Sequence, residues 1–168
     1  MNKVASATVT PLDPAVRAQI EDLINDYANA LDDEDIDRWP QFFTESAVYH
    51  VTNRENHEAA LPIGIIHCVG RGMMLDRVKA FHTANIFEPH VYNHILGRPS
   101  IAVDPSGKGY ASRCNLQVVR IMQNGRSDLY ATGKYLDTIV FENGAPRLQE
   151  RIVVLDSRHI DILMVVPI

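Results

Sequence analysis

The fold is decided by the stretch from Asp35 to Asn56, DIDRWPQFFTESAVYHVTNREN, where a short polar segment with the only tryptophan turns directly into an alternating strand. The segment through Trp39, Phe42 and Phe43 predicts a short helix. From Ala47 to Asn53, successive side chains alternate between two faces, and a period of two is typical of a β-strand. A helix-to-strand corner of this kind, placed after one long helix, indicates a cone-shaped α+β fold.

One long amphipathic helix precedes this corner. Asp13 is available as its N-cap, and Pro14 suits the first helical position, where a missing N–H removes no hydrogen bond. Apolar residues then recur at helical spacing in one stripe: Ile20, Leu23, Ile24, Tyr27, Ala28 and Leu31. Such a stripe predicts that one face of the helix is buried. The acidic run 32–35 is expected to end this helix and to cap the short one after it.

The chain after the corner is predicted to be mostly β-strand. The segment 55–72 is expected to form strand fragments and loop, and a third helix follows on Met74, Val78 and Phe81. Beyond it, turn signals such as Asn-Gly separate four β-rich runs, at 90–103, 109–123, 127–142 and 147–165. We therefore expect an α+β fold in which a strongly curved antiparallel sheet wraps the long N-terminal helix.

Composition and charge limit the classes of protein to which the chain can belong. At 168 residues and 46% hydrophobic, the chain has the length and apolar content of one domain, which we place at residues 13–168 after a disordered arm at residues 1–12. The net charge of −5 is spread along the chain without a basic block, which argues against nucleic-acid binding.

The lack of long apolar segments and the small number of cysteines indicate the cellular compartment. No run of residues has the apolar length of a signal peptide or a membrane span. The two cysteines, Cys68 and Cys114, are too few for a disulfide framework and are compatible with a reducing environment. The sequence therefore predicts a cytoplasmic protein that does not contact a membrane.

His90, Tyr92 and His94 alternate along one predicted strand, and two imidazoles at this spacing could bind one metal ion. Without an obvious third ligand, such histidines are more often hydrogen-bonded groups at a sheet face or an interface. An iron–sulfur or Rieske site needs cysteine and histidine ligands in close pairs, and the sequence has none. We therefore expect no metal and no cofactor bound to this chain.

Tyr27 and the acidic residues after it suggest a different chemistry. The Tyr27 phenol and the carboxylate of Asp32 or Asp33 could meet at the mouth of the cone, as in ketosteroid isomerase, where a tyrosine donates a hydrogen bond and an aspartate moves a proton. A stand-alone isomerase or dehydratase would use Tyr27 with Asp32 or His94, and a ligand-binding module would need the same cavity. The alternative is that Tyr27 belongs to the core and that the acidic run is a solvated helix junction.

Several segments, in the same order along the chain, resemble one family. They are RWPQFFTESAVYHVTNREN (38–56), GRGMMLDRV (70–78), PHVYNHILGRPSI (89–101), ATGKYLD (131–137), RLQERIVVLDS (147–157) and the final VVPI (165–168). From about Asp13 onward, the chain is similar to the small (beta) subunits of Rieske-type aromatic-ring-hydroxylating dioxygenases. Within that family it looks most like the small subunits of oxygenases that act on aromatic acids, such as terephthalate dioxygenase and salicylate 5-hydroxylase.

The resemblance implies a fold, partners and a division of labour. The family's small subunits have the cone-like fold of nuclear transport factor 2 and scytalone dehydratase (NTF2-like or cystatin-like), and they trimerise beneath an alpha trimer as α3β3. The large alpha subunit holds the Rieske [2Fe–2S] cluster and the mononuclear non-haem iron, and it receives electrons from NAD(P)H through a reductase. The resemblance therefore implies a structural beta subunit without catalytic residues.

Polar residues that alternate with buried positions are the candidates for contacts between subunits, since they suit an interface rim rich in hydrogen bonds. They are Arg71, Arg77, His90, Tyr92, His94, Tyr135 and Asp137. The aromatic residues of the opening corner are interpreted as a hydrophobic plug at one end of the cone rather than as a substrate-stacking surface.

Overall fold

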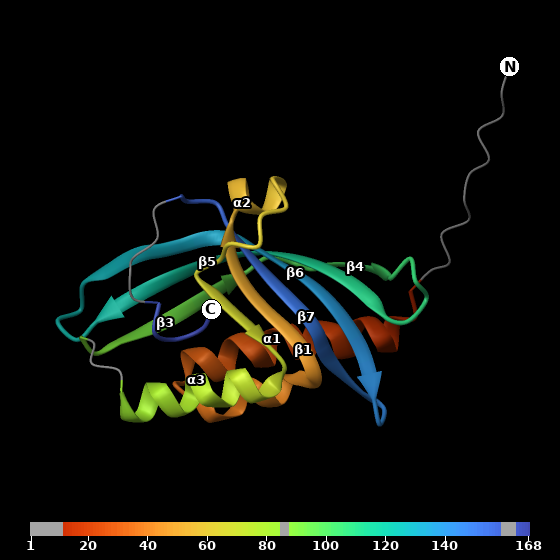
Figure 1. Ribbon diagram of the computed structural model, residues 1–168, viewed down its shortest axis with the longest axis horizontal. Coiled ribbons are helices and arrows are strands. Elements are labelled where there is room, and N and C mark those ends of the chain that lie inside the picture. Colours follow the sequence, from red (N-terminus) through yellow and green to blue (C-terminus); the bar gives the residue numbers. More distant parts are fainter. Residues whose placement is uncertain (1–11, 85–87, 159–163) are drawn as a thin grey trace, which may run out of the picture.

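The computed structural model describes residues 12–84, 88–158 and 164–168, and it shows a curved sheet that arches over two helices (Figure 1). The predicted arm lies outside the described residues except for Leu12, which packs against the core. The helices are α1 (Pro14–Asp32), the 3-10 helix η1 (Ile36–Phe42), α2 (Arg54–Glu58) and α3 (Arg71–Thr83). The strands are β1 (Phe43–Asn53), β2 (Ile66–Val69), β3 (His90–Leu96), β4 (Ser100–Val103), β5 (Tyr110–Met122), β6 (Ser127–Glu142) and β7 (Ala145–Leu155).

The long predicted helix is α1, and its first turn is capped as expected. The side chain of Asp13 accepts a hydrogen bond from the backbone N–H of Ala15 at 2.9 Å, and Pro14 opens the helix. The predicted apolar stripe is buried along its whole length. The short helix after it differs in kind from the prediction, because it is a 3-10 helix and Phe43 already belongs to β1.

Seven strands form one sheet in the order β2-β1-β7-β6-β5-β3, and β4 also pairs with β5. The strands from β3 onward pair antiparallel, as predicted. Asn143 and Gly144 have φ angles of 52° and 79°, which suit the tight hairpin turn between β6 and β7. The pairing of β1 with β7 is parallel. Local sequence patterns did not predict this pairing, because it joins strands from the two ends of the chain.

Three predicted boundaries are corrected. The run 90–103 is two strands, because Gly97 to Pro99 interrupt it and a proline cannot donate a ladder hydrogen bond. The run 147–165 leaves the sheet at Leu155. The segment 55–72, predicted as strand fragments and loop, begins inside a five-residue helix, α2. The side chain of Asn53 caps the first turn of this helix. A helix this short has no apolar periodicity that could have predicted it.

The two faces of the sheet have different surroundings. Helices α1 and α3 both lie on the concave side, where α1 contacts β3 and β7 and α3 contacts β1 and β2 (Figure 1). None of the described long helices lies over the convex side, and the short α2 stands near the ends of β1 and β7. Antiparallel sheets commonly bury one face in this way and leave the other available.

The aromatic residues of the opening corner form the centre of the core. Trp39, Phe43 and Tyr49 are fully buried, and their rings meet edge to face with centroids 5.1–5.9 Å apart. Tyr27 adds a contact to Phe42 at 5.6 Å. Each such pair contributes about 0.5–1.5 kcal/mol beyond the burial of apolar area. The corner aromatics are therefore packed inside the cone, as their interpretation as a plug requires.

A buried ion pair lies beside this aromatic cluster. Arg151 and Asp137 are opposite each other on β7 and β6, and two hydrogen bonds of 2.8 Å join their side chains, neither of which is exposed. The rings of Tyr27 and Tyr135 flank the guanidinium, at 4.0 and 3.9 Å from its carbon. Burial alone would lower the pKa of Arg151, but the Asp137 carboxylate outweighs it and raises that pKa above its ordinary value.

We predict that Arg151→Met destabilises the chain by about 3–5 kcal/mol, because it leaves the Asp137 carboxylate buried without its partner. The free energy of unfolding in urea at pH 7 measures this loss. The double variant Arg151→Met with Asp137→Leu removes both charges and should recover most of it. A loss of less than about 1 kcal/mol in the single variant would contradict the central place given to this pair.

Candidate functional site

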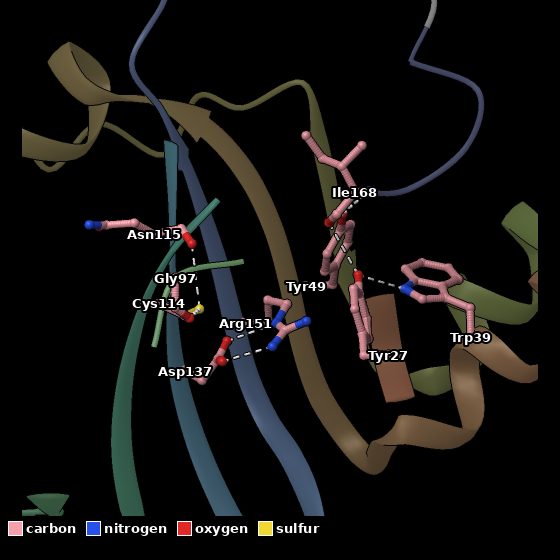
Figure 2. Close-up of polar contacts among 9 residues, drawn as sticks. All are labelled: Tyr27, Trp39, Tyr49, Gly97, Cys114, Asn115, Asp137, Arg151 and Ile168. Carbon is pink, nitrogen blue, oxygen red and sulfur yellow. Dashed lines mark hydrogen bonds and ion pairs between the residues drawn. The ribbon is translucent and has the colours of Figure 1, made fainter. Parts of the chain in front are cut away.

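Inside the cone, two tyrosine hydroxyls are directed at one backbone oxygen of Ile168 (Figure 2). Tyr49 donates a hydrogen bond to the backbone oxygen of Ile168 at 2.8 Å, and Tyr27 donates to the same atom at 3.2 Å. The indole N–H of Trp39 donates in turn to the Tyr27 hydroxyl at 3.0 Å. Tyr27 comes from the buried stripe of α1 and Tyr49 from the inward face of β1, so the corner between these elements brings them together.

Both hydroxyls keep their protons at neutral pH. Burial raises the pKa of Tyr27, although the nearby Arg151 guanidinium opposes that shift. Burial also raises the pKa of Tyr49 well above its ordinary value, and the closeness of Tyr27 adds to the effect. Because a protonated phenol donates, the pair presents two donors to a single oxygen atom.

Asp32 and His94 also meet, but not with Tyr27. Nδ1 of His94 lies 2.6 Å from Oδ1 of Asp32, and the backbone N–H of His94 donates to Oδ2 at 2.9 Å. Tyr27 has no exposed surface, and its hydroxyl is bound to Ile168 and Trp39. The three residues proposed for a stand-alone isomerase or dehydratase therefore do not line one solvent-reachable cavity. In the acidic run predicted to be a solvated helix junction, Asp33, Glu34 and Asp35 are exposed as expected, whereas Asp32 ties the end of α1 to β3.

Four of the predicted subunit-contact residues have buried side chains. Tyr92, Tyr135 and Asp137 are at most 5% exposed, and the side chain of His94 has no exposed surface. They offer a partner almost no side-chain surface in this chain. Alternation along a strand predicted two faces, but it did not predict which of them lies inside the cone.

The other three predicted contact residues lie nearer to solvent. The partly exposed side chain of Arg71 forms an ion pair with Glu45. Nδ1 of His90 lies 2.8 Å from the carbonyl oxygen of Glu88. Arg77 is directed inward, and its guanidinium donates to the carbonyl oxygens of Met164 and Val165. Of these three, Arg71 remains the clearest candidate for contact with a partner.

Metal ligands do not gather in the part of the chain that the structure describes, where no three His, Cys, Asp or Glu side chains are grouped to hold an ion. Cys68 and Cys114 are free and buried, and burial raises the pKa of both thiols. These side chains do not fit a Rieske cluster or a mononuclear iron. Over the same described residues, no helix is long and apolar enough to cross a membrane.

The convex face of the sheet is hollowed in two places. One hollow, of about 340 Å³, has the aliphatic side chains of Ala102, Ala111, Leu136 and Ile152 in its walls, together with hydroxyl residues and the charged Arg113 and Glu150. The other, of about 580 Å³, is more polar, and its walls include Arg54, Arg113, Asn115, Lys134 and Asp156. The sequence patterns did not predict this surface, although aliphatic residues at alternate positions of the last strands were the available signal.

A matching family model and a similar protein identify the class to which this chain belongs. The SnoaL-like domain family matches residues 15–152, which agrees with the cone of one curved sheet over α1. The chain is 42% identical over 142 residues to the terephthalate 1,2-dioxygenase terminal oxygenase component subunit beta 2 of Comamonas sp, covering 84% of this chain and 92% of that protein.

Two further relatives narrow the class to a family. The anthranilate 1,2-dioxygenase small subunit of Burkholderia cepacia is 36% identical over 146 residues, or 87% of this chain and 90% of that protein. A solved beta subunit assigned to an aromatic-ring-hydroxylating dioxygenase of Novosphingobium aromaticivorans is 30% identical, with a TM-score of 0.83 over 92% of this chain and 97% of that one. This chain belongs to the family of small (beta) subunits of aromatic-ring-hydroxylating dioxygenases.

Three histidines gather where β1, β2 and α2 meet. His50 and His67 are directly opposite each other on β1 and β2, with ring centroids 4.8 Å apart. The loop backbone packs on one ring, since a Cβ added at Gly64 would lie 2.2 Å from Nε2 of His50. Burial lowers the pKa of His50, and positive charge on His67 and His57 would lower it further.

This lowered pKa predicts a loss of stability in mild acid. The unfolded chain binds a proton at His50 near its ordinary pKa of about 6.5, whereas the folded chain binds it only at lower pH. The contribution of His50 to the free energy of unfolding is therefore complete above about pH 6.5. It is lost as the pH falls through the pKa of His50 in the folded chain. His50→Asn should reduce the decrease in unfolding free energy between pH 7.5 and pH 5.0. His82→Asn, at an exposed histidine of α3, is the control, and identical pH dependences for the wild type and His50→Asn would refute the assignment.

Proposed function

We propose that this chain is the structural, non-catalytic beta subunit of a multicomponent oxygenase that hydroxylates an aromatic acid. The observation that carries the proposal is the closed cone, in which Tyr27 is fully buried and bonded to Ile168 rather than directed at a solvent-reachable cavity. The relatives named for terephthalate and anthranilate dioxygenases support the aromatic acid, because both names denote such a substrate.

In this proposal the chemistry takes place in the partner. The large alpha subunit holds a Rieske [2Fe–2S] cluster and a mononuclear non-haem iron, and it receives electrons from NAD(P)H through a reductase. This chain forms a trimer beneath an alpha trimer, as α3β3, in the cytoplasm. This chain contributes by burying surface of its partner, because a folded subunit that binds its partner stabilises the whole assembly by mass action. A closed ring of subunits also leaves no contact surface open to further association.

The aliphatic part of the convex face supplies a surface for this assembly. Ile152 and Leu136 are neighbours on β7 and β6, and they line the smaller hollow. Val69, on the edge strand β2, is 58% exposed and pairs with Val48 on β1. Exposed apolar side chains on the outer side of a sheet are typical of protein contact sites, although His50 and Glu150 lie between these two pairs. We therefore assign this face to contact with a neighbouring subunit.

A charge placed on this face should prevent assembly without unfolding the chain. We expect Ile152→Lys to reduce co-elution with the large subunit about tenfold or more, because an unpaired ammonium group would be buried in the contact. Size-exclusion chromatography of the co-expressed subunits measures the effect, and circular dichroism of the isolated variant checks its fold. Lys108→Glu, in the exposed turn before β5, is the control. Assembly of a folded Ile152→Lys variant at the wild-type level would rule out this face.

A separate experiment tests whether the iron and the activity belong to the large subunit. Purified alone, the chain should contain no stoichiometric iron by mass spectrometry and should oxidise no aromatic acid. Co-expressed with its large partner, it should elute as one large complex. One equivalent of iron per isolated chain, or two separate elution peaks at micromolar concentration, would contradict the proposed role.

A further inference from the structure

The larger hollow of the convex face, of about 580 Å³, has a floor of sheet and one raised side. Strands β5 and β6 build its floor, Ile95 borders it on β3, and Arg54 borders it on α2. Figure 1 shows α2 standing outside the arch of the sheet. The hollow is therefore open to a partner that approaches the outer side of the cone.

The charges around the larger hollow do not balance. Its walls carry three cationic side chains and one carboxylate, which belongs to Asp156. Arg54 forms an ion pair with this carboxylate. The side chains of the other two cations, Arg113 and Lys134, form no hydrogen bond or ion pair with another residue that the structure describes. Two positive charges are thus in surplus here, in a chain whose net charge is −5.

Strand register brings these two cations together on the outer face. Lys134 is directly opposite Asn115, and Arg113 lies two residues before Asn115 on β5. Cys114 and Leu116 are buried, so the alternate residues Arg113 and Asn115 face outward. Diagonal neighbours of this kind are about 7–8 Å apart, a spacing that long side chains can bridge. Like charges at this spacing repel each other, and an anion between them would remove the repulsion.

A carboxylate is the group that fits this arrangement. A guanidinium such as that of Arg113 binds a carboxylate through two parallel hydrogen bonds, and the ammonium group of Lys134 adds a point charge. The amide of Asn115, beside them, can donate further hydrogen bonds. A partner without acidic groups would cover two cations without compensating them, which is costly. The larger hollow therefore suits an acidic partner.

The larger hollow adjoins the surface that we assign to subunit contact. Arg113 lines both hollows, so a partner that covers the smaller one also reaches the larger. The carboxylates of the smaller hollow leave Arg113 free. Asp137 is bonded to Arg151, and no ion pair joins Glu150 to Arg113 within the described parts of the chain.

We propose that the larger hollow is the docking site for an acidic segment of the large subunit, in which an aspartate or glutamate carboxylate is bound between Arg113 and Lys134. This inference rests on the proposed role as a beta subunit and adds the chemistry of the contact. The occupant is the large subunit rather than a second copy, because two copies that each carry a net charge of −5 repel each other. Aliphatic contacts in the smaller hollow supply burial, and the two cations fix the register of the partner and speed its association.

Neutralising both cations should weaken assembly and make it less sensitive to salt. We expect Arg113→Gln with Lys134→Gln to raise the dissociation constant of the complex about tenfold or more, the effect of losing hydrogen bonds to a charged group. From about 50 mM to about 300 mM NaCl, that constant should rise severalfold for the wild type and change little for the variant, because salt screens ion pairs. Analytical ultracentrifugation of the co-expressed, purified complex measures both effects. The control removes two exposed charges elsewhere, by Lys79→Gln with Lys108→Gln.

A cross-link without a spacer identifies the occupant. A carbodiimide joins the ammonium group of Lys134 to a carboxylate only where the two are in contact, and mass spectrometry of the digested complex shows which chain supplied the carboxylate. We expect an aspartate or glutamate of the large subunit. Lys134→Arg keeps the charge but does not react, so this variant should assemble like the wild type and lack the cross-link.

The same measurements separate failure of the docking site from failure of the proposed role. If the wild type forms no complex with the large subunit, the proposed role itself is wrong. If the complex forms and the glutamine double variant keeps the wild-type dissociation constant and salt dependence, the docking site is wrong and the role stands. A cross-link from Lys134 to a second copy of this chain, or none in the intact complex, would also overturn the docking site.

Discussion

The hydrogen bonds between two buried tyrosines and the backbone oxygen of Ile168 constrain much of the molecule. A buried hydroxyl without a partner costs about 1–3 kcal/mol, so the side chains of Tyr27 and Tyr49 need acceptors inside the cone. Trp39 donates to the first of them, which ties the 3-10 helix to α1. One oxygen atom thus connects the first helix, the corner, the first strand and the final residues. The parallel pairing of β1 with β7 holds the sheet around the same point.

Because these donors are satisfied inside the cone, the outer surface of the sheet is what remains for the subunit contact that we propose. A cone whose interior is packed with aromatic rings, an ion pair and residues 164–168 offers no open cleft around Tyr27. The convex face differs from it, because small and aliphatic side chains of β4, β5, β6 and β7 line a hollow there beside Arg113 and Glu150, and none of the described long helices covers it. A structural subunit needs a rigid core and an outer surface suited to contact with its partner, and this arrangement is compatible with both.

Periodicity predicted the elements much better than it predicted their neighbours. The stripe through Tyr27 and the Asn143–Gly144 turn are local signals, and both α1 and the last hairpin formed as expected. The inward direction of Tyr135 and Asp137 depends instead on which side of the sheet faces α1. The place of Ile168 depends on two tyrosines more than a hundred residues away. Information of that kind lies in tertiary contacts, and a single sequence does not contain it as a pattern.

The Asp32–His94 pair shows how residues suited to catalysis can serve the architecture. A carboxylate at the end of a helix faces the negative end of the helix dipole, so its position there needs compensation. Asp32 obtains it from β3, where it accepts the backbone N–H and approaches the imidazole of His94. β3 is an edge strand, and unpaired N–H groups along an edge invite association with other chains. The carboxylate therefore occupies one of these groups and fixes the strand to α1, so this N–H is not free to pair with a strand of another chain.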